Sequence, residues 1–331
     1  MKRPIAYIAG TGRGLPATVF KNDQFGSIGI ETTDEWIVER TGIKQRYIAM
    51  KESATDLAAA ASRAAMEKAG VHAGELDIVV VGTASPDRLL PSAAVDLQAA
   101  LGAGRAAAFD VGAACSGFIY GTTVAEGMIA TGMADTALVV GVEKLSSIVD
   151  WTDRATCVLF GDGAGAAVLR RAKKDSNRGI LSTFVRSDGT LGDLLCRPPV
   201  TTGHPLAQPQ PGATMPQFVK MNGREVFKNA VRSMSEAATR ALDAAKMTGA
   251  DIDLMIPHQA NIRIIEATAK HANISMDKVY QNVDRFGNTS AASVPIAFDE
   301  AIQKGVVGEG ANVLLVAFGA GFTWGSMVVK L

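Results

Sequence analysis

The sequence has few cysteines, few histidines and no excess of charge of either sign. Only three of its 331 residues are cysteines, and Cys115, Cys157 and Cys196 are too scattered for a disulfide framework or a zinc site. A reducing compartment is therefore expected. The 33 Lys and Arg residues balance the 33 Asp and Glu residues, which argues against nucleic-acid binding through an overall positive field.

Long apolar runs are also missing. The longest, such as 78–81 and 137–142, have the length of buried strands and fall far short of the ~20 residues of a membrane-spanning helix. Near the start of the chain, Gly10 and Gly12 interrupt the apolar stretch before it reaches the length found in signal peptides. We therefore expect a cytoplasmic protein that neither spans nor targets a membrane.

What is present is the composition of an ordinary globular protein. Hydrophobic residues make up 47% and charged residues 20%, which excludes disordered and fibrous classes. The length suggests two domains or one large duplicated domain. Short Val- and Ile-rich runs alternate with Ala-rich stretches among 34 glycines, and this alternation predicts an α/β fold.

Three helix starts carry capping signals. The motif TTDE at 32–35 predicts a short helix that Gly42 ends. The motif SATD at 53–56 opens an Ala-rich helix that stops at Gly70, and NGRE at 222–225 opens a long amphipathic helix.

An internal repeat is the most informative feature of the sequence. Residues 66–83 (MEKAGVHAGELDIVVVGT) align without gaps with 242–259 (LDAAKMTGADIDLMIPHQ), at an offset of 176, and 110–142 resemble 284–317 at a nearby offset. Two copies of one α/β unit predict a pseudo-two-fold axis, with functional sites at the matching strand ends. The seam at 170–177 divides the chain into halves, 1–173 and 174–331. The Pro-rich stretch 193–217 is predicted to be a functional flap or a mobile insertion.

Cys115 is the first candidate for chemistry. It lies in GAACSG (112–117) between a predicted strand and a predicted helix, where the helix dipole favours thiolate, as in a nucleophile elbow. The alternative is a buried structural cysteine. Cys157 and Cys196 lack this context and are interpreted as core and loop residues.

His258 and Asn288 are the second and third candidates. His258 ends a predicted strand, where it could act as a general base or hydrogen-bond donor, or simply be a half-buried structural histidine. Asn288, in GNTS, falls within one residue of Cys115 in the repeat, although such an asparagine is otherwise an ordinary turn residue. The repeat thus predicts one central cleft for all three side chains. The other histidines have structural contexts: His72, His204 and His271.

Several glycine and basic clusters suggest ligand contacts. The clusters at 10–15 and 161–166 lack the strand–helix context of a dinucleotide site, whereas 319–322 is interpreted as a turn that brings amides close to a ligand. Trp36 and Arg40 share one helix face and suit an adenine and a phosphate. Further basic residues lie on helix faces that could equally be solvated surface: Lys220, Arg224, Lys228, Arg232, Arg263 and Lys270.

Six stretches together carry a resemblance that covers the whole chain: TDEWIVERTGI (33–43), DVGAACSG (110–117), RATCVLFGDGAGAAV (154–168), PHQANIR (257–263), NVDRFGNTS (282–290) and AFGAGFTWG (317–325). The chain resembles the β-ketoacyl-[acyl-carrier-protein] synthase III family of the thiolase superfamily. This resemblance implies a thiolase-like fold, with duplicated α/β halves in five layers, αβαβα.

The resemblance also implies roles for individual residues. It implies a catalytic triad of Cys115, His258 and Asn288, with the backbone amides of Cys115 and Ala320 as the oxyanion hole. It implies a coenzyme A cleft at Thr32, Trp36, Arg40, Arg154 and Asn261. Carrier-protein docking is expected at Gln259, Ala260, Asn261, Ile262, Arg263, Lys228 and Lys270, and an acyl pocket at Leu90, Phe160 and Phe318.

Two positions depart from the family pattern. Leu90, which would reach across a dimer to the partner's acyl pocket, is often aromatic in the family, and Ala320 replaces the middle glycine of the usual GGG turn.

The implied function is the initiating condensation of type II fatty-acid synthesis. A short acyl-CoA would acylate Cys115 and then condense with malonyl-carrier protein, in a cytoplasmic homodimer that needs no metal or resident cofactor. The alternatives are a related condensing enzyme of a specialised polyketide or quinolone pathway, a Cys-dependent thioester hydrolase, and a degenerate binding scaffold.

Overall fold

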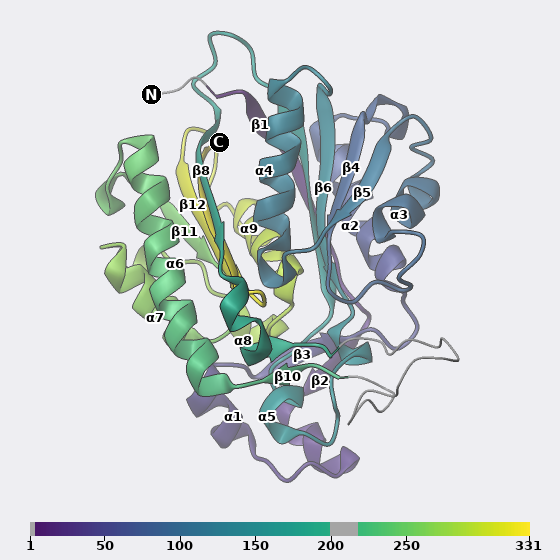
Figure 1. The fold of residues 1–331 in the computed structure, drawn as a ribbon, viewed down its shortest axis with the longest axis vertical. Coiled ribbons are helices and arrows are strands. Elements are labelled where there is room, and N and C mark those ends of the chain that lie inside the picture. Colours follow the sequence, from purple (N-terminus) through teal and green to yellow (C-terminus); the bar gives the residue numbers. More distant parts are fainter. Residues whose placement is uncertain (1–3, 199–217) are drawn as a thin grey trace.

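The computed structural model describes residues 4–198 and 218–331, which form two β-sheets and three layers of helices (Figure 1). His204 and residues 199–217 of the predicted flap lie outside the described residues. The first sheet has the order β1 (Ala6–Gly14), β7 (Gly163–Arg171), β6 (Thr136–Glu143), β4 (Ile78–Gly82), β5 (Ala107–Val111). The second has the order β11 (Leu254–Pro257), β12 (Asn312–Gly319), β13 (Thr323–Lys330), β8 (Gly179–Ser187).

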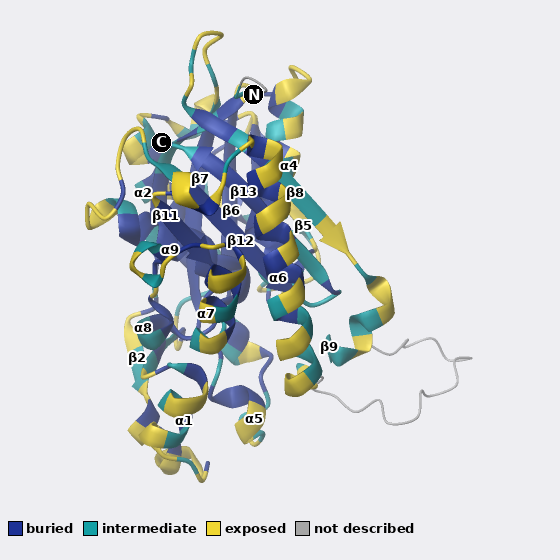
Figure 2. Ribbon diagram, turned by 90° about the vertical axis from the view of Figure 1, so that its left-hand side faces the viewer, coloured by how far each residue is buried: buried dark blue, intermediate teal, exposed yellow. Residues whose placement is uncertain are grey.

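Helices cover both sheets and separate them. The outer face of the first sheet packs against α2 (Ala54–Ala69) and α3 (Ala93–Leu101), and the outer face of the second against α6 (Gly223–Ala245) and α7 (Ile262–His271). Between the sheets lie α4 (Gly117–Ala130) and α9 (Ser293–Gln303). The strands are mostly buried while the outer helices expose one face (Figure 2). The predicted five-layered αβαβα fold is confirmed.

Smaller elements gather at one end of the molecule, near the strand ends that carry the site (Figure 1). They are the two-stranded sheet of β2 (Thr18–Lys21) and β3 (Gln45–Ile48), the two-stranded sheet of β9 (Leu195–Cys196) and β10 (Lys220–Met221), and the short helices α1 (Asp34–Thr41), α5 (Arg154–Cys157) and α8 (Val283–Phe286). None of the helices in the two described ranges combines the length and apolar character needed to cross a bilayer.

The three predicted helix starts form, with Thr33 rather than Thr32 as the N-cap of α1. The Thr33, Ser53 and Asn222 side chains accept hydrogen bonds from the first turns of α1, α2 and α6. Gly42 and Gly70 end α1 and α2 in the left-handed conformation.

The two glycine clusters belong to strands, as their missing context suggested. A Cβ at Gly10, Gly12 or Gly14 of β1 would lie within 2.1–2.3 Å of a backbone oxygen of α2. These glycines therefore let the helix lie directly on the strand. Gly163 begins strand β7 rather than a helix.

In the structure, the repeat at an offset of 176 extends beyond the stretch that aligns in the sequence, and no gap is needed. The 3-10 helices η3 (Ala114–Ser116) and η8 (Ser290–Ala292) start 176 positions apart, and so do the pairs α4 and α9, and β6 and β12. Cys115 is therefore equivalent to Ala291, and the prediction that Asn288 falls within one residue of Cys115 is wrong. That alignment matched Asp110 with Asp284, but Asp110 lies in strand β5 and Asp284 in helix α8.

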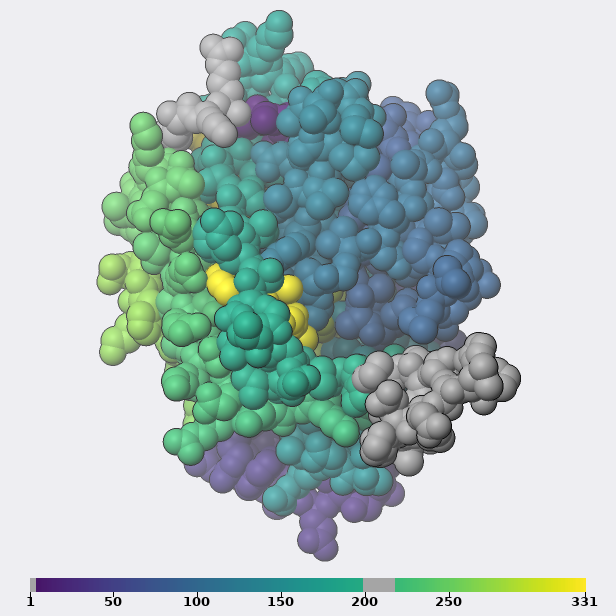
Figure 3. Space-filling model, viewed as in Figure 1, coloured from purple at the N-terminus to yellow at the C-terminus, as the bar shows by residue number. Residues whose placement is uncertain are grey.

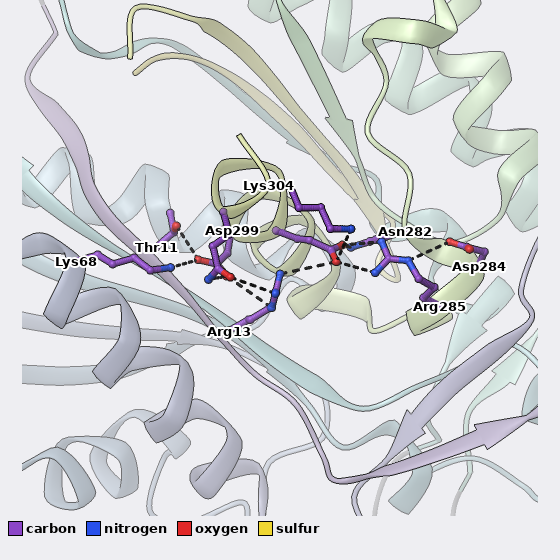
Figure 4. Close-up of polar contacts among 10 residues, drawn as sticks. Thr11, Arg13, Lys68, Asn282, Asp284, Arg285, Asp299 and Lys304 are labelled. Atoms are coloured by element: carbon purple, nitrogen blue, oxygen red, sulfur yellow. Dashed lines mark hydrogen bonds and ion pairs between the residues drawn. The ribbon is translucent and has the colours of Figure 1, made fainter. Parts of the chain in front are cut away.

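A buried charge cluster joins the two halves of the chain behind the site (Figure 4). Asp299 of α9 is fully buried and accepts hydrogen bonds from Thr11 (2.9 Å) and from Lys68 Nζ (2.7 Å). Its neighbour Glu300 binds Arg285 through two hydrogen bonds of 2.6 and 2.8 Å. Burial alone would raise the pKa of Glu300, but hydrogen bonds from Arg285, Asn282 and Lys304 outweigh it and lower the pKa to about 2.

Glu300→Gln tests this cluster. A carboxylate whose pKa falls from 4.5 to about 2 on folding stabilises the protein above pH 4.5 and loses that contribution as the pH falls toward 2. We expect the variant to lose on the order of 3 kcal/mol of unfolding free energy at pH 7. Denaturant titrations from pH 7 to 3 measure whether the difference from wild type narrows below pH 4.5. A difference independent of pH, or one shared by the exposed Glu309→Gln control, contradicts the assignment.

Candidate active site

Cys115 lies where a strand, a tight turn and a helix meet. Strand β5 leads into η3, in which Ala114 has a φ of 44°, and α4 begins at Gly117. This confirms the strand–turn–helix arrangement that the sequence predicts. Burial raises the pKa of the Cys115 thiol to about 12. The thiol therefore needs a proton acceptor before it can act as a nucleophile.

His258 follows strand β11 and is 3% exposed. Burial lowers its pKa to about 4, so the imidazole is neutral at neutral pH. Its Nδ1 lies 2.5 Å from Ser293 Oγ, which also accepts a hydrogen bond from the Gln259 amide. The Ser293 hydroxyl can therefore give its own proton to Nδ1, which places the ring proton on Nε2. In this tautomer His258 presents an Nε2–H donor to the cavity.

Asn288 is fixed in a similar way. Its backbone bonds to Leu159 and Gly161 at 2.9 and 3.0 Å, and its Oδ1 accepts a hydrogen bond from the Ser290 amide at 2.9 Å. Because Oδ1 is occupied, the side chain has its Nδ2 group left as a donor for a ligand.

The three candidate residues line one cavity, as the sequence predicts, although they come from distant parts of the chain. The cavity has a volume of about 200 Å³ and is also lined by Phe160, Phe318 and Ala320. In the space-filling view, atoms of the C-terminal segment are visible at the surface between the first and second halves of the chain (Figure 3). Most of the wall is apolar: Leu145, Ile148, Leu159, Leu195, Val219, Val226, Met234 and Ile264. An apolar wall strengthens the electrostatic interactions of the few polar groups in the cavity.

A close backbone contact sets the geometry beside Cys115. A Cβ on Gly319, the last residue of β12, would lie 2.5 Å from the Cys115 nitrogen. The turn after Gly319 runs from Ala320 to Phe322 and leads into β13, as predicted. The Cys115 and Ala320 amides therefore belong to neighbouring backbone segments.

The predicted coenzyme A residues gather at α1 and α5. The guanidinium carbons of Arg40 and Arg154 lie 4.6 and 4.7 Å from the centre of the Trp36 ring. Asn261 lines the cavity and donates a hydrogen bond of 2.8 Å to the Arg40 carbonyl. The hydroxyl of Thr32 is buried and has no hydrogen-bond partner. Together they form an aromatic and cationic surface that leads to the cavity.

The predicted docking residues divide between surface and core. Lys228 on α6, and Arg263 and Lys270 on α7, are exposed on neighbouring helices, while Ala260, Asn261 and Ile262 are half-buried. The prediction that Gln259 takes part in docking is wrong. This residue is 1% exposed, and its side chain makes four hydrogen bonds to the backbone of the core. It cannot contact a docked protein.

Leu90 does not line the cavity of its own chain and is 85% exposed. Its predicted position in a partner's pocket stays a prediction. Cys157 is buried, as expected, whereas Cys196 lies in strand β9 and lines the cavity, which its context did not reveal. Within residues 4–198 and 218–331, His, Cys, Asp and Glu side chains form no group of three that could hold a metal ion.

Sequence reasoning missed three polar residues of the site: Glu143, Ser290 and Ser293. Glu143 is 0% exposed at the end of β6, Ser290 holds its carboxylate, and Ser293 holds His258. A glutamate at the end of the apolar run ALVVGVE was the available signal, because an ionisable group there must find buried partners.

Comparisons with known proteins agree with this geometry. Two family models match, the 3-oxoacyl-[acyl-carrier-protein (ACP)] synthase III domain over residues 109–189 and its C-terminal domain over 242–331. The chain is 50% identical over 331 residues to the beta-ketoacyl-[acyl-carrier-protein] synthase III of Xanthomonas campestris pv. campestris, covering 99% of both chains.

Solved structures show the same likeness. The 3-oxoacyl-[acyl-carrier-protein] synthase III of Aquifex aeolicus superposes with a TM-score of 0.91 at 44% identity, covering 98% of this chain and 100% of that one. A priming beta-ketosynthase from a polyketide biosynthetic pathway superposes with a TM-score of 0.90 at 32% identity, covering 99% and 97%.

Gly319→Ala tests the close contact beside Cys115. Because the new methyl group would overlap the Cys115 backbone, we expect a loss of about 1–3 kcal/mol of stability and a displaced thiol. Thermal unfolding and the rate of Cys115 alkylation by iodoacetamide measure both effects. Gly112→Ala is the matched control, since a Cβ there meets nothing within 4 Å. Equal stability and equal alkylation rates of the two variants would contradict the close contact between Gly319 and Cys115.

Proposed function

This chain belongs to the 3-oxoacyl-[acyl-carrier-protein] synthase III family, and we propose that it catalyses the initiating condensation of type II fatty-acid synthesis. Acetyl-CoA, or another short acyl-CoA, condenses with malonyl-[acyl-carrier protein] to give 3-oxoacyl-[acyl-carrier protein], CO2 and coenzyme A. The coenzyme A thioester enters as a substrate rather than a resident cofactor. The observation that carries this proposal is the convergence of Cys115, His258 and Asn288 on one apolar cavity.

The first half-reaction is acyl transfer to Cys115. Its thiolate attacks the thioester carbonyl, and coenzyme A leaves as a thiolate. The Cys115 and Ala320 amides hold the oxyanion, and losing one such donor typically costs ~10²–10³ in rate. Trp36, Arg40, Arg154, Thr32 and Asn261 hold the coenzyme A portion, because the aromatic ring suits adenine and the guanidinium groups suit phosphates.

The second half-reaction is decarboxylation followed by carbon–carbon bond formation. His258 Nε2–H and Asn288 Nδ2–H donate hydrogen bonds to the malonyl thioester oxygen, which stabilises the enolate formed as CO2 leaves. The enolate carbon attacks the acyl group on Cys115 and expels the Cys115 thiolate. Neutral donors suit this step because a carboxylate in the same place would repel the enolate.

The rival functions have less support. The relative that is 50% identical over 99% of both chains carries the synthase III name, whereas the polyketide-priming enzyme is 32% identical. A thioester hydrolase would use Cys115 but gives no role to a second pair of donors. A binding scaffold would give no role to a buried, neutral histidine that lines the same cavity as Cys115.

Its assembly and cellular setting are part of the proposal. The enzyme is a cytoplasmic homodimer of chains whose halves are residues 1–173 and 174–331. The exposed pair Leu89 and Leu90, at 73% and 85%, suits burial against a second subunit and supports the role of Leu90 in a partner's acyl pocket.

The central test follows acylation and decarboxylation separately. Intact mass spectrometry with a panel of acyl-CoA primers labels Cys115 in the wild type, and we expect Cys115→Ser to form no stable acyl-enzyme. We expect His258→Ala to lose malonyl decarboxylation by ~10²-fold or more while acylation is less affected, because the donor acts on the enolate. Acyl-enzyme formation by Cys115→Ser, or equal losses of both steps in His258→Ala, would overturn the roles.

Carrier-protein docking has its own test on α6 and α7. We expect Lys228→Glu and Lys270→Glu each to raise the KM for malonyl-carrier protein about tenfold, with kcat and the KM for acetyl-CoA unchanged, because an acidic partner loses a favourable charge. Lys173→Glu, exposed in the connection between β7 and β8, is the control. Equal effects of all three substitutions, or no salt dependence, would show that α6 and α7 are not the docking surface.

A further inference from the structure

A buried carboxylate with no assigned role lies directly behind the cavity wall. Glu143 is 0% exposed, and no Lys, Arg or His nitrogen of the described residues comes within the 4.0 Å of an ion pair. Its oxygens instead accept hydrogen bonds from Ser85 Oγ, Thr83 Oγ1, Ser290 Oγ and the amides of Ala84 and Ala291. Burial raises the pKa of this carboxylate, and the donors, which hold it in place, lower the pKa only in part.

Ser290 connects this carboxylate to the nucleophile. Its Oγ donates to Glu143 Oε1 at 2.8 Å, and its short helix η8 packs against η3, which carries Cys115. Ser290 and Cys115 line the cavity whereas Glu143 does not. The backbone of Ser290 adopts a φ of 45°, an uncommon conformation for a residue with a side chain. A hydroxyl between a thiol and a carboxylate can pass a proton from one to the other.

His258 is poorly suited to take the same proton. It is fully buried and neutral, and protonating it beside a new thiolate would create two charges where none existed. Transfer to Glu143 only moves one negative charge from oxygen to sulfur. Burial raises the pKa of Glu143 as well as that of Cys115, which makes the carboxylate a better acceptor.

We propose that Glu143 accepts the Cys115 proton through Ser290, so that the thiol and the carboxylate share one proton during turnover. The Cys115 S–H proton passes to Ser290 Oγ as the Ser290 hydroxyl proton passes to Glu143 Oε1. The thiolate then attacks the acyl-CoA carbonyl carbon, the bond from that carbon to the coenzyme A sulfur breaks, and coenzyme A leaves as its thiolate.

The same relay runs backward in the second half-reaction. When the enolate carbon attacks the acyl group, the bond between that group and Cys115 breaks and the sulfur leaves with the electron pair. The proton held on Glu143 returns through Ser290 to this sulfur, which restores the thiol and the carboxylate. Protons balance over the cycle. This use of the relay rests on the proposed function, whereas the proton transfer itself requires no substrate.

Most of the groups that face Glu143 are hydroxyls and backbone amides, which do not titrate near neutral pH. The segment after β4 contributes the hydroxyls of Thr83 and Ser85 and the amide of Ala84. Helix η8 contributes the Ser290 hydroxyl and the Ala291 amide, and η3 contributes Cys115. The next residue, Lys144, turns its Nζ to the Glu52 carbonyl at 2.8 Å. His258 borders the same cavity.

The pH dependence of Cys115 alkylation by iodoacetamide tests the relay without substrate or carrier protein. In the wild type, the shared proton makes the thiolate fraction independent of pH, so the rate has a plateau around neutral pH. In Glu143→Gln and Ser290→Ala, thiolate forms only by losing a proton to water. We expect their rates to rise about tenfold per pH unit from pH 6 to 9 and to lie ~10²-fold below wild type at pH 7.

Controls separate proton transfer from loss of structure. Ser85→Ala removes a donor to the other carboxylate oxygen and leaves the Ser290 link, so it keeps the plateau; His258→Ala keeps it too. Circular dichroism checks folding, and Ser290→Ala serves alone if Glu143→Gln does not fold. A plateau retained in Ser290→Ala or Glu143→Gln, or lost in His258→Ala or Ser85→Ala, overturns the proposal. Normal alkylation profiles with no condensation would instead refute the proposed function alone.

Discussion

The site depends on two strained turns that occupy equivalent places in the two halves. Ala114 at the start of η3 and Ser290 at the start of η8 lie 176 positions apart and have φ values of 44° and 45°. A side-chain-bearing residue in this region costs on the order of 1–3 kcal/mol, so the surrounding packing must hold it there. The first turn presents the Cys115 amide and thiol at the start of α4. The second presents the Ser290 hydroxyl beside them.

The charge distribution follows from what the proposed reaction generates. Negative charge develops on an oxyanion and on an enolate inside a small apolar cavity. In the proposed mechanism, neutral N–H donors on His258 and Asn288 stabilise that charge without a permanent cation, which would also bind the reactants and products tightly. The one carboxylate close by, Glu143, does not line the cavity and meets Cys115 only through Ser290. Its charge is therefore available to take a proton but is kept from direct contact with the enolate.

Individual elements were predicted well because their signals are short-range: the caps of α1, α2 and α6 and the strand–turn–helix at Cys115 each depend on a few neighbouring residues. The repeat at an offset of 176 indicated the duplication, and the family resemblance implied the five-layered arrangement. The residues that were missed or misplaced depend on tertiary contacts. Gln259 sits in a surface-like motif but bonds to backbone that comes from Pro257, Tyr280 and Asn282. Nothing in the local sequence of Ser293 reveals that it meets His258.

The repeat also explains why a duplicated scaffold has one site rather than two. Each functional residue is paired, 176 positions away, with glycine or alanine: Cys115 with Ala291, His258 with Gly82, Asn288 with Gly112, and Glu143 with Gly319. Gly319 lets the two halves meet, because a Cβ there would lie 2.5 Å from the Cys115 nitrogen, whereas Gly82 lets strand β4 approach the Gly117 backbone within the first half. At Gly319, the position equivalent to Glu143, a side chain would fill the space that Cys115 needs. At that position the asymmetry of the two halves is a steric consequence of bringing two like folds into contact.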